Sequence, residues 1–323
     1  MQTIEHIPLA DIEAARRRLS GLALRTPLVR LNVDDAPAEI WLKLENLQPI
    51  GSFKLRGAGN AMTLASRAEL ARGVWTPSAG NMAQGVAWNA RRLGVACRAV
   101  VPEHAAETKL AAIRRLGAEI VKVPFESWWE AIASGEPPRA ANNAIDGLLV
   151  HPVSNPAVIA GNGSIGLEIL EDLPDVDAVI VPFGGGGLVS GIASAIRASR
   201  PKTQVYACEV ETAAPLAASL RAGEACTVEY TPSFVDGIGG RSVLPSMWPI
   251  VSRSVDGSIV VKLDLVAAAI RLLVERNRNW LPKLESFFAR RGRTFVVVGA
   301  AHLVGPDGLL AMLKSKGYSV EQQ

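Results

Sequence analysis

Residues 177–210 read DAVIVPFGGGGLVSGIASAIRASRPKTQVYACEV. A β-branched run is followed by glycines, then by apolar residues at helical spacing, and then by a second β-branched run. This order predicts a strand, a helix and a strand, the unit of open parallel sheets. Residues 96–124 repeat it in ACRAVVP, AAETKLAAIRRLGA and EIVKVP. The sequence therefore predicts an α/β fold with two open, twisted, mostly parallel sheets flanked by helices.

The chain has 323 residues, enough for two domains, because single cores rarely grow beyond about 250 residues. The segment SGEPPRAANNAIDG, residues 134–147, is rich in Pro, Gly and Asn and separates the two series. We expect residues 72–147 to form a small domain. Residues 1–71 and 148–323 are expected to form a large domain, in which residues 279–323 are atypical.

Composition excludes several functional classes. With 49% hydrophobic residues, 20% charged residues and a formal net charge of +3, we expect a folded protein that binds neither nucleic acid nor membranes. Its longest apolar runs are shorter than the roughly 20 residues of a spanning helix, and residues 1–21 lack signal-peptide charges. We therefore expect a cytoplasmic protein. Cys97, Cys208 and Cys226 lack metal-ligand spacing and are expected to be buried free thiols.

Lys54 lies in GSFKLRG, residues 51–57, among glycines, a serine and apolar side chains. Burial beside Phe53 and Leu55 would lower the pKa of its amine and free the lone pair that condensation with a carbonyl requires. The pattern favours a lysine that forms a Schiff base. The alternative is an ordinary loop lysine whose amine reaches water.

The segment PSAGNMAQG, residues 77–85, follows an expected strand at residues 73–76 and precedes an expected helix. Small residues before a helix leave backbone N–H groups to bind a carboxylate, and Asn81 offers an amide to a phenol or ketone oxygen. The segment is thus a candidate anion site. The alternative is an N-cap turn in which Ser78 or Asn81 caps the helix.

The segment PFGGGGLVSG, residues 182–191, ends a strand in four glycines and begins a helix. Such a loop lets several backbone N–H groups approach one phosphate, and the helix dipole adds to the attraction. One alternative is a dinucleotide fingerprint, since Gly185, Gly187 and Ser190 nearly match its spacing and Glu209 ends the next strand. The other is a tight turn without a ligand.

These three features supply what one cofactor, pyridoxal phosphate, needs, whereas a nicotinamide enzyme would leave Lys54 unexplained. The motifs KLENLQPIGSFKLRGA, SAGNMAQGVA, NPAVIAGNGSIGLEILEDLPDVDAVIVPFGGGGLVSGIA and FVDGIGG resemble those of the threonine/serine dehydratase and serine racemase family of fold-type II pyridoxal-phosphate enzymes. The resemblance runs over residues 7–278. It implies a tryptophan synthase β-like fold and a homodimer.

The resemblance also implies a role for each motif. Lys54 is similar to the lysine that bonds covalently to the cofactor, Phe53 to the residue beside the ring, and Asn81 to the residue that binds the phenolic oxygen. The loop that receives the substrate carboxylate would comprise Ser78, Ala79, Gly80 and Asn81. The phosphate cradle would comprise Gly184, Gly185, Gly186, Gly187 and Leu188.

Some positions depart from the family pattern. Ala79 stands where racemases have a serine that acts as the second base, which disfavours racemisation and leaves dehydration open. Met82 replaces the usual histidine and is expected to alter the pocket wall. A divalent cation site of some relatives would use Glu209 and the carbonyl of Ala213, but Pro215 replaces its acid, so we expect a weak or absent metal site.

Residues 279–323 lack the family's EGAG-type helix start and its SGGN or CGGN strand end, whose Ser or Cys meets the pyridine nitrogen. They resemble instead the C-terminal end of the TraB/GumN family, including its Gly-x-x-His element at Gly299–His302. We therefore expect a chimera joined near Glu275–Asn279. Its strand–turn–helix pattern would complete the large domain, with Ala300 near the pyridine nitrogen and His302 in a structural role.

The leading hypothesis is a pyridoxal-phosphate dehydratase, or ammonia-lyase, that converts L-threonine or L-serine to a 2-oxo acid and ammonia. Lys54 would remove the Cα proton, and the cofactor phosphate would protonate the leaving hydroxyl. Three alternatives remain: a dehydratase of another 3-hydroxy amino acid, a serine racemase, and a chimera that binds the cofactor with little activity. The expected partner is a small amino-acid substrate.

Overall fold

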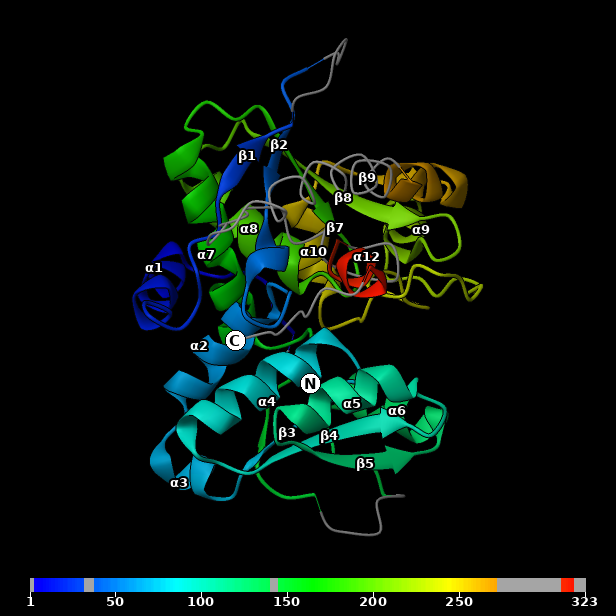
Figure 1. The fold of residues 1–323 in the computed structure, drawn as a ribbon. Helices are drawn as coiled ribbons and strands as arrows, with labels where there is room; N and C mark the ends of the chain where they lie inside the picture. Colours follow the sequence, from blue (N-terminus) through cyan, green and yellow to red (C-terminus); the bar gives the residue numbers. More distant parts are fainter. Residues whose placement is uncertain (1–2, 32–37, 140–144, 272–308, 317–323) are drawn as a thin grey trace. The chain divides into compact units, whose positions relative to one another are not determined.

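The structure is a computed structural model that describes residues 3–31, 38–139, 145–271 and 309–316 (Figure 1). The chain forms two compact units, Met1–Val260 and Val261–Gln323. In the second unit, residues 263–271 are helical and helix α12 spans Leu309–Ser315. None of the helices in the described ranges combines the length and the hydropathy that a membrane span requires.

A four-stranded parallel sheet has the order β5-β4-β3-β6. Along the chain, α4 follows β3, α5 follows β4 and α6 follows β5, and all three helices pack against the sheet (Figure 1). The strand–helix–strand order expected for residues 96–124 is confirmed. The elements are β3 (Val74–Pro77), α4 (Asn81–Leu93), β4 (Cys97–Pro102), α5 (Glu107–Arg115), β5 (Glu119–Val123), α6 (Phe125–Ser134) and β6 (Leu148–Leu149).

A second sheet has the order β7-β8-β9, and β7 pairs with β8 in parallel. Residues 177–210 form the expected strand, helix and strand. The elements are β7 (Ala178–Pro182), α8 (Gly187–Ser199), β8 (Gln204–Val210) and β9 (Gly257–Val261). The division into a large and a small domain stays a prediction. Strand β6 begins just beyond the expected boundary at residue 147 and pairs with β3 of the first sheet.

Helices α7 (Pro156–Asp172) and α8 pack almost backbone to backbone. A Cβ atom built on Gly191 of α8 would lie 2.4 Å from the Ile159 carbonyl oxygen, and one built on Gly163 of α7 would lie 2.9 Å from the Gly191 carbonyl oxygen. Only glycine permits this approach, since real Cβ atoms essentially never come within 3.0 Å of other atoms. The glycines predicted as part of the family motif therefore bring the two helices together.

Several of the remaining elements pack against this helix pair. Helices α1, α2 and α10 contact α7 or α8, and strands β1 and β2 form a separate antiparallel ribbon. These elements are α1 (Leu9–Arg18), β1 (Leu28–Arg30), β2 (Trp41–Lys43), the 3-10 helix η1 (Glu45–Leu47), α2 (Lys54–Leu64), α3 (Arg67–Ala71), α9 (Pro215–Ala222) and α10 (Trp248–Ser254). The three cysteines are free, as expected. Cys97 is buried, whereas Cys208 and Cys226 are only partly buried, so the burial expected for those two is wrong.

Candidate active site

Lys54 is the first residue of α2, so the start of this helix sets the direction in which its side chain leaves the backbone. Its Nζ atom donates a hydrogen bond to the carbonyl of Pro152 at 3.0 Å and lies 5.2 Å from the ring centroid of Phe53. Desolvation by the surrounding protein lowers the pKa of the Lys54 amine to about 8. Near neutral pH roughly one amine in ten is therefore unprotonated and nucleophilic.

The carbonyl that binds Lys54 belongs to a turn, residues 151–155, that the sequence analysis did not identify. The buried ring of His151 organises this turn, because its Nδ1 atom accepts the N–H groups of Val153 (3.1 Å) and Ser154 (2.7 Å). The hydrogen therefore sits on Nε2, which donates to the Ile132 carbonyl at 2.8 Å. Burial lowers the pKa of His151 to about 4, so its ring is neutral at pH 7.

The glycine loop joins β7 to the start of α8. Gly186 has φ +94°, a backbone conformation that side-chain-bearing residues rarely adopt, and it occupies the N-cap position of α8. Among the described residues, no acceptor meets the backbone N–H groups of residues 184–189. A Cβ atom on Gly184 would have no atom within 4 Å other than those of Gly184 and its two chain neighbours. Free donors at a helix N-terminus beside open space suit an anion such as phosphate.

The turn at residues 151–155 connects Lys54 to the glycine loop. The Pro152 carbonyl accepts the hydrogen bond of the amine. The side chain of the next residue, Val153, fills the space beside Gly185, so a Cβ atom built on Gly185 would lie only 2.5 Å from Val153 Cγ2. The same turn approaches Gly187, whose Cβ would be 3.2 Å from the Val153 carbonyl oxygen. The predicted amine and phosphate loop are therefore neighbours through this turn.

This contact predicts the effect of one added methyl group. Gly185→Ala should lower the free energy of unfolding by about 1–3 kcal/mol, because the new Cβ overpacks against Val153. Val153→Ala removes the obstructing atoms, so a double-mutant cycle by urea unfolding should give a favourable coupling of about 1 kcal/mol or more. A cycle with no coupling would show that Val153 is not the obstacle.

The second predicted loop lies at the start of α4. Gly80 is the N-cap and no side chain caps the helix, so the alternative reading of Ser78 or Asn81 as the cap is wrong. Ser78 instead accepts the N–H of Gly80 through its hydroxyl at 3.2 Å. Within the described ranges, no acceptor meets the N–H groups of Ala79 and residues 81–83. These donors can bind a carboxylate.

Helix α4 also packs against the start of α2, which brings this loop to Lys54. A Cβ on Gly85 would lie 3.0 Å from the Lys54 carbonyl oxygen. Met82, expected in the pocket wall, is 2% exposed and belongs to the hydrophobic core around α4. Asn81 is exposed, and its side chain is free to bind an oxygen, as no hydrogen bond to another described residue engages it.

Glu209, the expected weak cation ligand, is fully buried and caps α9. Its carboxylate accepts the N–H groups of Leu216 (2.9 Å) and Ala217 (2.8 Å) and the hydroxyl of Ser258 (2.6 Å). Pro215 begins α9, where its missing N–H costs nothing. Ala213 precedes the helix. In the part of the chain that the structure describes, no group of three His, Cys, Asp or Glu side chains could hold a metal ion.

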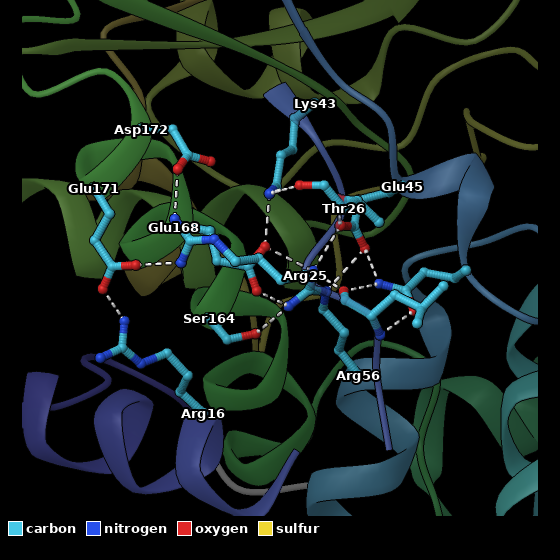
Figure 2. Close-up of polar contacts among 12 residues, drawn as sticks. Arg16, Arg25, Thr26, Lys43, Glu45, Arg56, Ser164, Glu168, Glu171 and Asp172 are labelled. Carbon is cyan, nitrogen blue, oxygen red and sulfur yellow. Dashed lines mark hydrogen bonds and ion pairs between the residues drawn. The ribbon is translucent and has the colours of Figure 1, made fainter. Parts of the chain in front are cut away.

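A buried ionic network holds the first turn of α2 (Figure 2). Its centre is Arg56, two residues after Lys54 and only 2% exposed. The guanidinium donates to Glu45 of η1 at 2.8 and 2.9 Å, and to Glu168 of α7 at 2.6 and 2.9 Å. It also donates to the Ser164 hydroxyl at 3.1 Å. These bonds fix the helix that carries the amine against two other elements.

Two further side chains join the network. Lys43 of β2 pairs with Glu168 at 2.6 Å, and the Thr26 hydroxyl donates to Glu45 at 2.6 Å (Figure 2). The formal charges balance, because two cations, Arg56 and Lys43, face two carboxylates. Sequence reasoning missed this network, although an arginine in the otherwise apolar and small-residue start of α2 signals a buried partner.

The expected junction at Glu275–Asn279, and the element Gly299–His302 with Ala300, lie outside the described residues.

Two family models match successive parts of the chain. The model described as pyridoxal-phosphate dependent enzyme matches residues 19–283, and that of the TraB/PrgY/gumN family matches residues 264–322. The matches overlap at residues 264–283, a range that includes the expected junction. Both resemblances drawn from the motifs are thus confirmed.

Known proteins resemble the chain over most of its length. It is 38% identical over 318 residues to an L-threonine ammonia-lyase of Thermotoga maritima, which covers 97% of this chain and 74% of that protein. The structure resembles a T.th. threonine deaminase, with TM-score 0.72, 32% identity and 96% and 93% coverage of the two chains. It also resembles a serine racemase of Dictyostelium discoideum, with TM-score 0.73, 31% identity and 96% and 92% coverage. These likenesses confirm the expected fold-type II architecture.

Proposed function

The chain belongs to the family of pyridoxal-phosphate dependent enzymes, and we propose that it eliminates water from L-threonine or L-serine to give a 2-oxo acid and ammonia. The observation that carries this proposal is the desolvated Lys54 amine beside a glycine loop with free N–H groups. The names of the relatives, a threonine ammonia-lyase and a threonine deaminase, support the same reaction.

The residues present fit the cofactor. Lys54 would bond to it covalently, Gly184–Leu188 would hold its phosphate, Asn81 would bind its phenolic oxygen and Phe53 would lie beside its ring. The free N–H groups and the open space at Gly184 support this assignment. When bound, pyridoxal phosphate supplies a ring that accepts electrons from the substrate Cα.

The chain's own residues would position the substrate and remove its Cα proton. The Lys54 amine, with a pKa of about 8, is suited to take the Cα proton near neutral pH. The Pro152 carbonyl holds this amine by one N–H, which leaves the nitrogen lone pair free. The N–H groups of Ala79 and residues 81–83 would bind the substrate carboxylate. Ala79 has no group that can carry a proton on the opposite face, which favours elimination over racemisation.

The proposal also covers the substrate class, the oligomeric state, the location and the roles of the two domains. The substrate is a small amino acid, and we propose a homodimer in the cytoplasm, as the family resemblance implies. The large domain, residues 1–71 and 148–323, would hold the cofactor, and the small domain, residues 72–147, would supply the carboxylate loop.

The proposal is tested by assaying products. The full chain, reconstituted with pyridoxal phosphate, should release 2-oxobutanoate from L-threonine or pyruvate from L-serine, with one ammonia per oxo acid. The D-enantiomers serve as matched controls and should be inert. Bound cofactor without any oxo acid from either substrate would overturn the proposal and favour an inert chimera. Conversion of L-serine to D-serine alone would favour a racemase.

A further inference from the structure

We propose that His151 is a positioning residue, whose ring shapes the turn at residues 151–155 so that the Pro152 carbonyl holds the Lys54 amine. It rests on the proposed function only in that Lys54 is taken as the reacting amine. The geometry of the turn carries the argument.

Both ring nitrogens of His151 form hydrogen bonds to the backbone. Nδ1 accepts two successive backbone N–H groups, from Val153 and Ser154, and so closes the turn around the intervening Pro152. Nε2 donates to the Ile132 carbonyl. The ring is 2% exposed, so water cannot readily replace any of these three bonds. His151 therefore sets the direction in which the Pro152 carbonyl points.

The turn touches several parts of the site through neighbouring residues. Pro152 binds the amine, and Val153 packs against the glycine loop. Asn155 caps α7 through its side chain, which accepts the Val158 N–H at 3.1 Å. A rotation of the peptide after Pro152 would therefore move the acceptor of Lys54 and the wall of the phosphate loop together.

The other side of the ring meets the end of α6. Ile132 lies in the last turn of this helix, where carbonyl groups lack partners within the helix. The Nε2–H of His151 supplies that partner. The ring thus forms a bridge from α6, which packs on the four-stranded sheet, to the turn that holds Lys54. Two substitutions can separate the two halves of this bridge.

His151→Asn keeps an acceptor oxygen near the position of Nδ1, which can form the Asx type of turn, and loses the bond to Ile132. His151→Gln keeps a donor near the position of Nε2 and loses the acceptor for the turn. His151→Phe loses both functions. Since the turn orients the Pro152 carbonyl, we expect the Asn variant to retain the Lys54 environment and the Gln and Phe variants to lose it.

The direct readout is the reactivity of Lys54 in the cofactor-free protein. Acetylation by acetic anhydride across pH, quantified by mass spectrometry of the Lys54 peptide, should give a midpoint near pH 8 for the wild type. The Gln and Phe variants should lower this midpoint by about one unit or more, because the amine loses the carbonyl acceptor that favours its protonated form. The Asn variant should keep it.

In the reconstituted enzyme, the Gln and Phe variants should lower kcat by about tenfold or more, with a smaller change in KM, while the Asn variant stays within about threefold. His104→Asn is the matched control. His104 stacks on Phe125 at 5.9 Å and makes no hydrogen bond to the turn, so its replacement should leave the Lys54 midpoint unchanged.

Two results would overturn the proposal. One is an unchanged Lys54 midpoint in the Gln variant. The other is that the Asn and Gln variants change the midpoint and kcat equally, in proportion to the unfolding free energy that each loses in urea. If the Phe variant fails to fold, the Asn and Gln pair still decides. The acetylation experiment needs neither cofactor nor substrate. Failure of the dehydratase assay is therefore distinguishable from failure of the positioning role.

Discussion

Lys54→Ala is expected to lower kcat for oxo-acid release by at least about a thousandfold and to abolish the visible absorbance of a lysine-bound cofactor. The variant loses the nucleophile and the base in one step, and general-base catalysis alone contributes about 10²–10⁴-fold. The amine is the group in the site whose pKa is lowered to about 8 by desolvation. Absorbance spectra and the oxo-acid assay measure the two effects separately.

The matched control is Lys109→Ala. Lys109 lies on α5, is 41% exposed and pairs with Asp236 at the surface, so its removal should leave the cofactor absorbance unchanged. Lys54→Arg preserves the positive charge and provides no nucleophile at neutral pH, and it should be as inactive as the alanine variant. Substantial turnover by Lys54→Ala would show that another group removes the proton.

Arg56→Met should lower the free energy of unfolding by about 3–5 kcal/mol, because it leaves two buried carboxylates without their main partner. The side chains of Glu45 and Glu168 are 14% and 6% exposed. Arg56→Lys should recover only part of the loss, since an ammonium cannot reproduce the fork of five N–H donors. Urea unfolding, followed by circular dichroism, measures both variants.

Arg16→Met provides the comparison at the surface. Arg16 pairs with Glu171, and both side chains are more than 40% exposed (Figure 2), so its loss should cost less than about 1 kcal/mol. Equal losses in the Arg16 and Arg56 variants would contradict the assignment of Arg56 as the anchor of α2. The Arg56 variants should also lose activity, because the same helix carries Lys54 at its first position.

Sequence patterns predicted the sheets because each strand–helix–strand unit has a local signal. In residues 96–124 and 177–210, β-branched runs, helical spacing and glycine follow one another within a few tens of residues. Lys54 could be predicted for the same reason, since its apolar neighbours Phe53 and Leu55 adjoin it in the chain. The glycine loop was visible because its four glycines are consecutive.

The groups that complete the site were less visible. The acceptor of Lys54 is a backbone carbonyl 98 residues further along the chain, and a carbonyl has no sequence signature. Glu209 was read from resemblance as a cation ligand, whereas its actual partners include two backbone N–H groups at the start of α9. Such partners depend on how the chain returns in space, which local patterns do not encode.

The glycine contacts along α7 limit how the protein can be altered. Cβ atoms at Gly161 and Gly166 would lie 2.7 Å and 2.8 Å from carbonyl oxygens of Arg56 and Ile192, on α2 and α8. Helix α7 is thus in close contact with the backbones of α2 and α8, which leave no room for a Cβ atom at these two positions. In directed evolution of this protein, we expect substitutions at these glycines of α7 to be eliminated. Changes in substrate preference would then have to come from substitutions in the surrounding loops.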